Sequence, residues 1–173
     1  NHTRNKELLK YAQTDALTGL YNKETTEQLT DELLSEDENK SHAFLILDVD
    51  CFKQINDIYG HAVGDIVLQK FGKLLKGTFR EGDILGRIGG DEFGVIMKNI
   101  QTKDIAMKKA EELLAKTQAY KIDELKGNNI SISIGISTAP QDGDCYMDLY
   151  KRADQALYQA KRSGKARVCN YFS

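Results

Sequence analysis

The sequence is poor in the features that mark several classes of protein. Its longest apolar runs, such as AFLIL at residues 43–47, are far shorter than the roughly 20 residues that cross a bilayer, and no charged-then-apolar leader opens the chain. Cys51, Cys145 and Cys169 are odd in number and widely spaced, without a CxxC pair, so neither a disulfide framework nor a zinc site is indicated. We therefore expect a segment without membrane contact in a reducing, cytoplasmic environment.

The net charge and the length of the chain further limit the class of protein. The 24 basic and 26 acidic residues give a net charge of −2, which lacks the basic excess of a general nucleic-acid binder, so DNA is not an expected partner. With 40% hydrophobic and 29% charged residues among 173, the composition is that of one globular domain with a sizeable core. The chain opens on Asn1 rather than Met, which suggests a segment of a longer protein.

Apolar periodicity predicts a mixture of helices and strands. Residues 5–13, NKELLKYAQ, place apolar side chains at helical spacing without a start signal, which predicts the end of a longer helix that enters the domain. Residues 65–79 carry one apolar stripe, and Asp65 is expected to cap that helix. Strands mixed with crossing helices predict an α/β fold in which helices surround a mostly antiparallel central sheet. Further helices are expected at 23–34, 103–118 and 146–161, and strands at 43–50, 83–88, 92–97 and 129–137.

Acidic residues lie at the end of the strand predicted at 43–50. This run, AFLILDVD, is apolar on both faces, which is typical of a central strand, and alternation places Asp48 and Asp50 on the same side. The next two strands flank Gly89 and Gly90, which predict a tight hairpin because glycine adopts positive φ at little cost.

The hairpin carries two further acids, Asp91 and Glu92. If its turn lies beside the end of the strand that carries Asp48, the three acids form an all-oxygen cluster suited to Mg²⁺. The alternative is an ordinary solvated turn in which these carboxylates meet water.

Several of these segments occur in a fixed order. DALTGLYN begins at Asp15, and DVDCFKQIND, GHAVGD, GGDEF and ADQALYQAKRSGK follow it. Together they resemble the GGDEF family of bacterial diguanylate cyclases over nearly the whole chain, from Asp15 to Lys165. The family fold resembles the palm of nucleotidyl cyclases and polymerases. The implied activity is a nucleotidyltransferase reaction that condenses two GTP into cyclic di-GMP and two pyrophosphates.

The resemblance implies roles for the acids. Asp48 and Asp91 match the family's metal-binding carboxylates and the Val49 carbonyl its backbone ligand, for Mg²⁺ or, as an alternative, Mn²⁺. Glu92 matches the second acid of the signature, which is left as a further ligand or as the proton acceptor. A metal near the α-phosphate would acidify the attacking 3′-hydroxyl, and the acid pair Asp91 and Glu92 would accept its proton. In-line attack on phosphorus requires no nucleophilic Ser or Cys.

Other positions match contacts to the base. Asn56 and Asp65 match a guanine-reading pair, since an amide donates and accepts and a carboxylate accepts from the N1–H and amino group of guanine, an edge that adenine lacks. His61 matches a further nucleotide contact. The alternatives are a turn role for Asn56, a helix cap for Asp65 and a structural hydrogen bond for His61.

The phosphates are matched to lysines. Lys161 and Lys165 lie at i and i+4, so they would meet one polyphosphate if the helix persists that far. Lys53 and the loop amides after Phe52 would hold it from the other side. The alternative is a solvated lysine face. The chain has no GxxxxGK[ST] loop, so a Walker-type phosphate cradle is excluded.

REGD, from Arg80 to Asp83, matches the RxxD pattern with which the family binds its own product and inhibits itself. Arg80 suits a phosphate or a guanine edge, and Asp83 suits a guanine amine. The stretch KKAEELLAK at 108–116 lacks the arginine that helps to clamp the product in other members.

The resemblance also implies boundaries and partners. Residues 1–13 are expected to be the end of an N-terminal linker helix and residues 14–173 the GGDEF domain. Since one such domain holds one GTP, a functional homodimer with opposed sites is implied. The leading helix would couple it to an upstream sensory domain, which makes this segment the cytoplasmic output of a larger sensor. The alternative is a non-catalytic module that binds GTP or cyclic di-GMP and signals through a partner.

Overall fold

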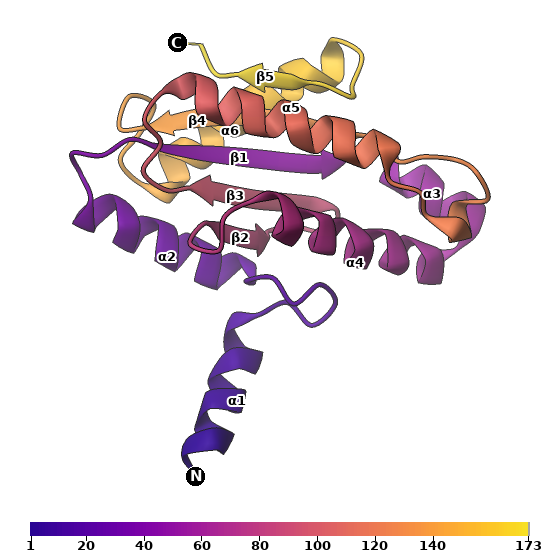
Figure 1. The fold of residues 1–173 in the computed structure, drawn as a ribbon, viewed down its shortest axis with the longest axis horizontal. Coiled ribbons are helices and arrows are strands. Elements are labelled where there is room, and N and C mark those ends of the chain that lie inside the picture. Colours follow the sequence, from indigo (N-terminus) through magenta and orange to yellow (C-terminus); the bar gives the residue numbers. More distant parts are fainter. Residues whose placement is uncertain (173) are drawn as a thin grey trace.

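The computed structural model describes residues 1–172, in which a five-stranded sheet carries helices on both faces (Figure 1). The strand order is β2-β3-β1-β4-β5, and neighbouring strands are antiparallel except β4 and β5. The predicted α/β fold with a mostly antiparallel sheet is therefore confirmed. The elements are α1 (His2–Gln13), α2 (Lys23–Glu36), β1 (His42–Val49), α3 (Phe52–Tyr59), α4 (His61–Thr78), β2 (Ile84–Arg87), β3 (Glu92–Met97), α5 (Lys103–Ala119), a 3₁₀ turn (Asp123–Leu125), β4 (Ile132–Ala139), α6 (Tyr146–Arg162) and β5 (Val168–Asn170).

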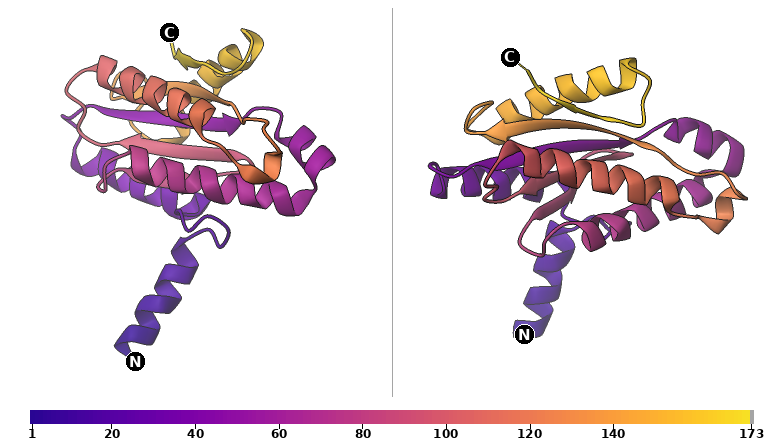
Figure 2. Two further views of the ribbon diagram at one scale, coloured as in Figure 1. Left: turned by 45° about the vertical axis from the view of Figure 1, so that its right-hand side comes forward. Right: turned by 45° about the horizontal axis from the view of Figure 1, so that its top comes forward.

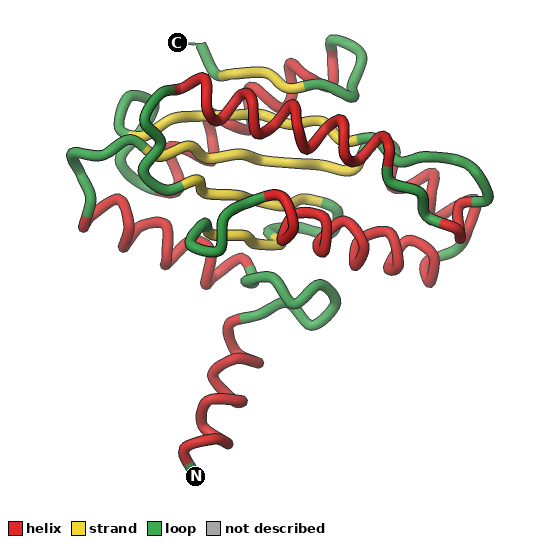
Figure 3. The backbone as a smooth tube through the Cα atoms, viewed as in Figure 1, coloured by secondary structure: helices red, strands yellow, loops and turns green. Residues whose placement is uncertain are grey.

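The central strand β1 is buried along its whole length because both of its faces are covered. Its odd-numbered residues, such as Leu45 and Leu47, join a core cluster with apolar residues of α4 and α5. Its even-numbered residues, such as Phe44 and Ile46, join a second cluster with α2 and α6. Figure 2 shows these two helical layers on opposite faces of the sheet, and Figure 3 separates the strands from the helices that cover them.

Helix α6 approaches the backbone of β4 closely at Gly135. A Cβ at this position would lie 2.1 Å from the Ala153 carbonyl oxygen and 2.4 Å from the Leu157 amide nitrogen. Because a backbone cannot yield as a flexible side chain does, glycine is required for this contact. The contact holds α6 against the sheet, and Lys161 in its last turn reaches Asp48 at the end of β1.

Helix α1 projects away from the sheet and contributes no buried residue (Figure 1). Leu8, Leu9 and Tyr11 are 59%, 59% and 81% exposed. The helix is joined to the body at its end, where the Asn22 side chain donates to the Ala12 carbonyl at 2.9 Å. Within residues 1–172, no helix combines the length and the apolar character that a membrane span requires.

Two local predictions are wrong, and two elements are not predicted by the sequence. Helix α4 begins at His61, after Gly60 with φ 91°, so Asp65 lies inside the helix and does not cap it. The alternative of a turn role for Asn56 is excluded, because Asn56 lies within α3, a helix that the sequence does not predict. The hairpin glycines Gly89 and Gly90 do not have positive φ. Strand β5 was not expected either.

Candidate active site

The end of β1 meets the start of β3. These strands are antiparallel with Asp48 opposite Glu92, and the Val49 amide donates to the Asp91 carbonyl at 3.4 Å. The register therefore brings Asp48, Asp91 and Glu92 to one edge of the sheet. This is the arrangement on which the predicted acid cluster depends.

The signature turn is held from the side by Arg87. Its guanidinium donates to the Gly90 carbonyl through Nε at 3.1 Å and Nη2 at 2.8 Å, and Nη1 pairs with Asp15 at 3.2 Å. A Cβ on Gly89 would lie 3.2 Å from the Cβ of Glu92, so glycine here leaves room for the acid and does not supply positive φ. The turn is fixed by side-chain bonds to its backbone.

Asp48 lies in an electrostatically unfavourable position. It is 7% exposed, and burial together with the neighbouring Asp91 carboxylate raises its pKa to about 7, although Lys161 opposes this. Lys161 Nζ donates to Oδ2 of Asp48, whereas Oδ1 is buried without a hydrogen-bond partner in residues 1–172. Burial lowers the pKa of Lys161, but the three acids outweigh it and raise the pKa. One lysine thus leaves a buried carboxylate oxygen unsatisfied.

Glu92 is held by α6 from the other side. The Tyr150 hydroxyl donates to Oε1 of Glu92 at 2.7 Å. Burial raises the pKa of Glu92, and Asp154 and Asp91 add to the rise, while Tyr150 and Lys161 lower it.

The acid edge fits a divalent cation. Its donors are carboxylate oxygens, which hard cations prefer, and Oδ1 of Asp48 is a buried acceptor without a donor. In the part of the chain that is described, no set of one carboxylate oxygen from each of Asp48, Asp91 and Glu92 lies within 4.8 Å of one another. Lys161 contacts Asp48 and Tyr150 contacts Glu92, so a cation held by these acids would compete with Lys161 for Asp48.

The predicted base-reading residues meet where α3 joins α4. A Cβ on Gly64 would lie 1.9 Å from Oδ1 of Asn56 and 3.2 Å from the Phe52 ring, so both side chains border this glycine. Asp65 is the next residue and is exposed, as is His61 at the start of α4. The fold therefore brings residues matched to one ligand to one helix junction.

The predicted lysines reach the site by different routes. Lys161 lies in the last turn of α6, but the helix ends at Arg162 and Lys165 has φ 63°, so the two are not one helical turn apart. Lys165 Nζ instead lies 3.2 Å from Sγ of Cys51, directly before α3. Lys53 is exposed in the first turn of α3. The i, i+4 geometry is wrong, yet Lys165 still lies beside the loop between β1 and α3.

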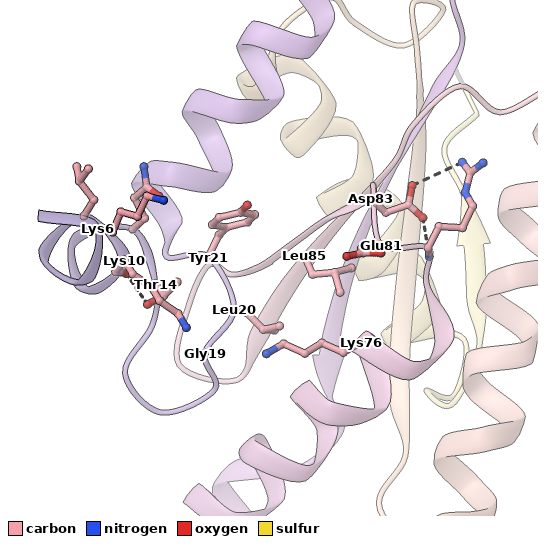
Figure 4. A pocket seen from close by; sticks show the side chains of 13 residues that line it. Lys6, Lys10, Thr14, Gly19, Leu20, Tyr21, Lys76, Glu81, Asp83 and Leu85 are labelled. Atoms are coloured by element: carbon pink, nitrogen blue, oxygen red, sulfur yellow. Dashed lines mark hydrogen bonds and ion pairs between the residues drawn. The ribbon is translucent and has the colours of Figure 1, made fainter. Parts of the chain in front are cut away.

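The RxxD pair lies at the other end of β3. Asp83 accepts from the amides of Arg80 and Lys98, each at 3.1 Å, and its side chain is 2% exposed. The Arg80 guanidinium is 62% exposed and lies 3.6 Å from Asp83. Both residues line a cleft of about 630 Å³ beside α1, together with Lys6, Lys10 and Lys76 (Figure 4).

Sequence reasoning missed two residues with evident roles in this geometry. Tyr150 contacts Glu92 from 58 positions away, and nothing local in the sequence marks it. Asp50 was noticed only as a neighbour of Asp48, yet it receives three hydrogen bonds, from Ser131, Ser133 and the Ala166 amide. Such partners are brought together only by the sheet and by the turn after α6.

Comparison with known proteins gives consistent relatives. A family model described as diguanylate cyclase, GGDEF domain, matches residues 12–167. Diguanylate cyclase A of Treponema denticola is 37% identical over 170 residues, which is 95% of this chain and 46% of that protein. The response regulator PleD of Caulobacter vibrioides is 38% identical over 165 residues, which is 92% of this chain and 36% of PleD. This chain spans less than half the length of either relative.

Solved structures match it as well. The GGDEF domain of PA1120 (TpbB or YfiN) from Pseudomonas aeruginosa has a TM-score of 0.86 at 33% identity, covering 92% of this chain and 94% of that chain. The coiled coil and GGDEF domain of DgcB from Caulobacter crescentus, in complex with c-di-GMP, has a TM-score of 0.89 at 25% identity, covering 98% and 91%. On the evidence of sequence and fold together, the chain belongs to the GGDEF family of diguanylate cyclase domains.

Proposed function

We propose that residues 14–173 form a diguanylate cyclase domain that condenses two GTP into cyclic di-GMP and releases two pyrophosphates. The observation that carries this proposal is the buried, unsatisfied Oδ1 of Asp48 at an edge where two further acids meet. Such a set of oxygens fits an ion that also binds phosphates. Residues 1–13 would be the end of a linker helix from an upstream sensory domain.

In this proposal the acids bind the metal and accept the proton, and the lysines neutralise the phosphates. Asp48, Asp91 and the Val49 carbonyl would hold Mg²⁺ or Mn²⁺, which when bound spreads the charge of the α-phosphate and acidifies the 3′-hydroxyl. Glu92 accepts the proton of that hydroxyl on the carboxylate oxygen that Tyr150 leaves free. Lys161, released from Asp48, and Lys165 neutralise the departing pyrophosphate, and Lys53 and the amides after Phe52 hold it from the α3 side.

Base selection belongs to the junction of α3 and α4. The Asn56 amide donates to and accepts from the guanine edge, the Asp65 carboxylate accepts from its N1–H and amino group, and His61 is a further contact. Each domain offers one such junction, so two copies must oppose their sites to join two nucleotides. The rate per domain should therefore rise with protein concentration.

Pyrophosphate release from GTP tests the proposal. With Mg²⁺ at high protein concentration, the wild-type chain should release it. Asp48→Asn, which loses a metal ligand, and Glu92→Gln, which loses the proton acceptor, should each lose at least about 100-fold in kcat. Both variants should keep the wild-type unfolding temperature. Asp104→Asn, an exposed acid in the first turn of α5, is the matched control and should retain the rate.

Two results would contradict the assignment. Full turnover in either acid variant would remove that acid from the chemistry. Tight GTP binding by a wild-type dimer that releases no pyrophosphate would favour the non-catalytic signalling module instead.

A further inference from the structure

The turn that follows α6 has an unusual backbone. After the helix ends at Arg162, three consecutive residues have positive φ: Gly164 at 121°, Lys165 at 63° and Ala166 at 49°. Glycine adopts such values readily, but Lys and Ala rarely do, so the surrounding structure has to stabilise this conformation.

The stabilising group is the buried carboxylate of Asp50. The Ala166 amide donates to Oδ2 of Asp50 at 3.1 Å. The hydroxyl of Ser131 donates to the same oxygen at 2.6 Å, and that of Ser133 donates to Oδ1 at 2.6 Å. Asp50 is 8% exposed, and its own amide donates to the Ser131 carbonyl at 2.9 Å. One carboxylate thus joins the end of β1, the start of β4 and the turn after α6.

This turn determines where Lys165 lies. Its Nζ is 3.2 Å from Sγ of Cys51, the residue between Asp50 and α3. Cys51 is exposed and has φ 56°, so the chain bends sharply here before Phe52 and Lys53. The ammonium group therefore lies over the loop that leads into α3, at the same end of β1 as Lys161.

We propose that Asp50 is a positioning residue for nucleotide binding: it holds the turn at 164–166 so that Lys165 faces the β- and γ-phosphates at the loop before α3. The inference rests on the proposed function, because it takes GTP as the ligand of this site. Asp50 contacts no substrate and acts through Lys165.

Whether neutralising Asp50 strengthens or weakens triphosphate binding distinguishes a positioning role from a purely electrostatic effect. Removing a negative charge beside a phosphate site relieves Coulomb repulsion, and this effect alone strengthens phosphate binding. If Asp50 positions Lys165, the neutral variant Asp50→Asn instead binds the triphosphate more weakly, because its amide cannot accept from all three donors and the turn relaxes.

The experiment measures binding of 3′-deoxy-GTP, which lacks the attacking hydroxyl, and of 3′-deoxy-GMP, which lacks the outer phosphates, both with Mg²⁺. We expect Asp50→Asn to weaken 3′-deoxy-GTP binding by about tenfold, the effect of one misplaced charge-assisted contact, with 3′-deoxy-GMP binding within about twofold of wild type. Ser133→Ala, which removes one of the three donors, should give a smaller loss in the same direction and guards against a variant that fails to fold.

A double-mutant cycle with Lys165→Gln tests whether Asp50 acts through this lysine. We expect the double variant to bind 3′-deoxy-GTP no more weakly than Lys165→Gln alone. The matched control is Ser137→Ala, because Ser137 is equally buried on β4 but donates to the Leu149 carbonyl of α6, away from the turn. It should leave both affinities unchanged.

The outcomes are distinct. Equal or tighter 3′-deoxy-GTP binding by Asp50→Asn would overturn the inference while leaving the proposed function intact. Equal losses for both nucleotides, or additive losses in the cycle, would reduce Asp50 to a structural role. A wild-type chain that binds no guanine nucleotide would overturn the proposed function itself, and this inference with it.

Discussion

Asp48 and Glu92 each meet a different partner on α6, Lys161 for the first and Tyr150 for the second. The Tyr150 ring also packs on Phe44, with centroids 6.5 Å apart, and on Tyr146 at 5.8 Å. Tyr150→Phe therefore removes one hydroxyl and keeps the packing. Because the hydroxyl lowers the pKa of Glu92 against the effect of burial, its loss should raise that pKa.

We expect Tyr150→Phe to lower kcat by about tenfold, the usual effect of losing a hydrogen bond to a charged group. The acidic limb of its pH–rate profile should move to higher pH. Steady-state kinetics across pH measures both effects, with Tyr158→Phe, an exposed tyrosine of the same helix, as the control. A profile that coincides with wild type would show that the Tyr150 hydroxyl does not tune Glu92.

His42, at the start of β1, makes stability depend on pH. It is 1% exposed, and its Nδ1 accepts from the Asn99 amide at 3.0 Å. Burial lowers its pKa from 6.5, Lys40 and Lys98 add to this, and Asp37 opposes it. Below pH 6.5 the imidazole of His42 is protonated more readily in the unfolded chain than in the folded chain. The contribution of neutral, buried His42 to the free energy of unfolding is therefore complete above pH 6.5 and is lost as the pH falls below it.

His42→Gln can accept the same amide and carries no charge, so it should remove this dependence, which is at most about 1.4 kcal/mol per pH unit for one proton. Urea unfolding on either side of pH 6.5 measures it. Asp48, whose pKa is raised to about 7, changes stability in the opposite direction as the pH falls, so the informative quantity is the difference between variant and wild type. His2→Gln, exposed on α1, should keep the wild-type slope. If the free energy of unfolding of His42→Gln depends on pH as in wild type, other groups cause this dependence.

At the scale of elements, the sequence predicts those helices and strands whose apolar residues recur at regular spacing. Strand β1, whose run AFLIL is apolar on both faces, and the helices α4, α5 and α6 are predicted at nearly their observed positions. Helix α3 was not, because it begins after the left-handed Cys51 without a side-chain cap and buries no residue. Strand β5 has three residues and pairs only with β4, which is too short for alternation to show. The cluster of Asp48, Asp91 and Glu92 can be predicted because these acids lie at the ends of predicted strands. The contacts of Asp50 and Tyr150 cannot, because they depend on tertiary packing.

The junction of α3 and α4 depends on close contact at Gly64. We expect Gly64→Ala to displace Asn56, because the added methyl would lie 1.9 Å from its Oδ1. Preference for GTP over ATP should then fall several-fold, although alanine favours the helix itself by about 1 kcal/mol. Competition between the two nucleotides measures the preference. Gly77→Ala, in the same helix with nothing within 4 Å, is the control. Intact discrimination in Gly64→Ala would place base recognition elsewhere.

For the whole molecule, the antiparallel register separates two sites. Asp83 binds the Lys98 amide just beyond one end of β3, while Glu92 begins that strand at the other end. A ligand in the cleft beside α1 would therefore not occupy the nucleotide site that we propose for the same domain. Inhibition from this cleft would have to act through α1 or, in the proposed dimer, through the facing copy.

Arg80 is the residue that tests such inhibition cleanly. Asp83 is buried and holds two backbone amides, so replacing it would disturb the turn, whereas the Arg80 side chain is mostly exposed. We expect Arg80→Ala to keep the initial rate of cyclic di-GMP synthesis and to raise the inhibition constant of the product by about tenfold or more, the effect of losing one charge-assisted contact. Progress curves measure this, with Lys151→Ala, at an exposed position of α6, as the control. If Arg80→Ala reaches its plateau at the same product concentration as wild type, the cleft beside α1 does not bind an inhibitory product.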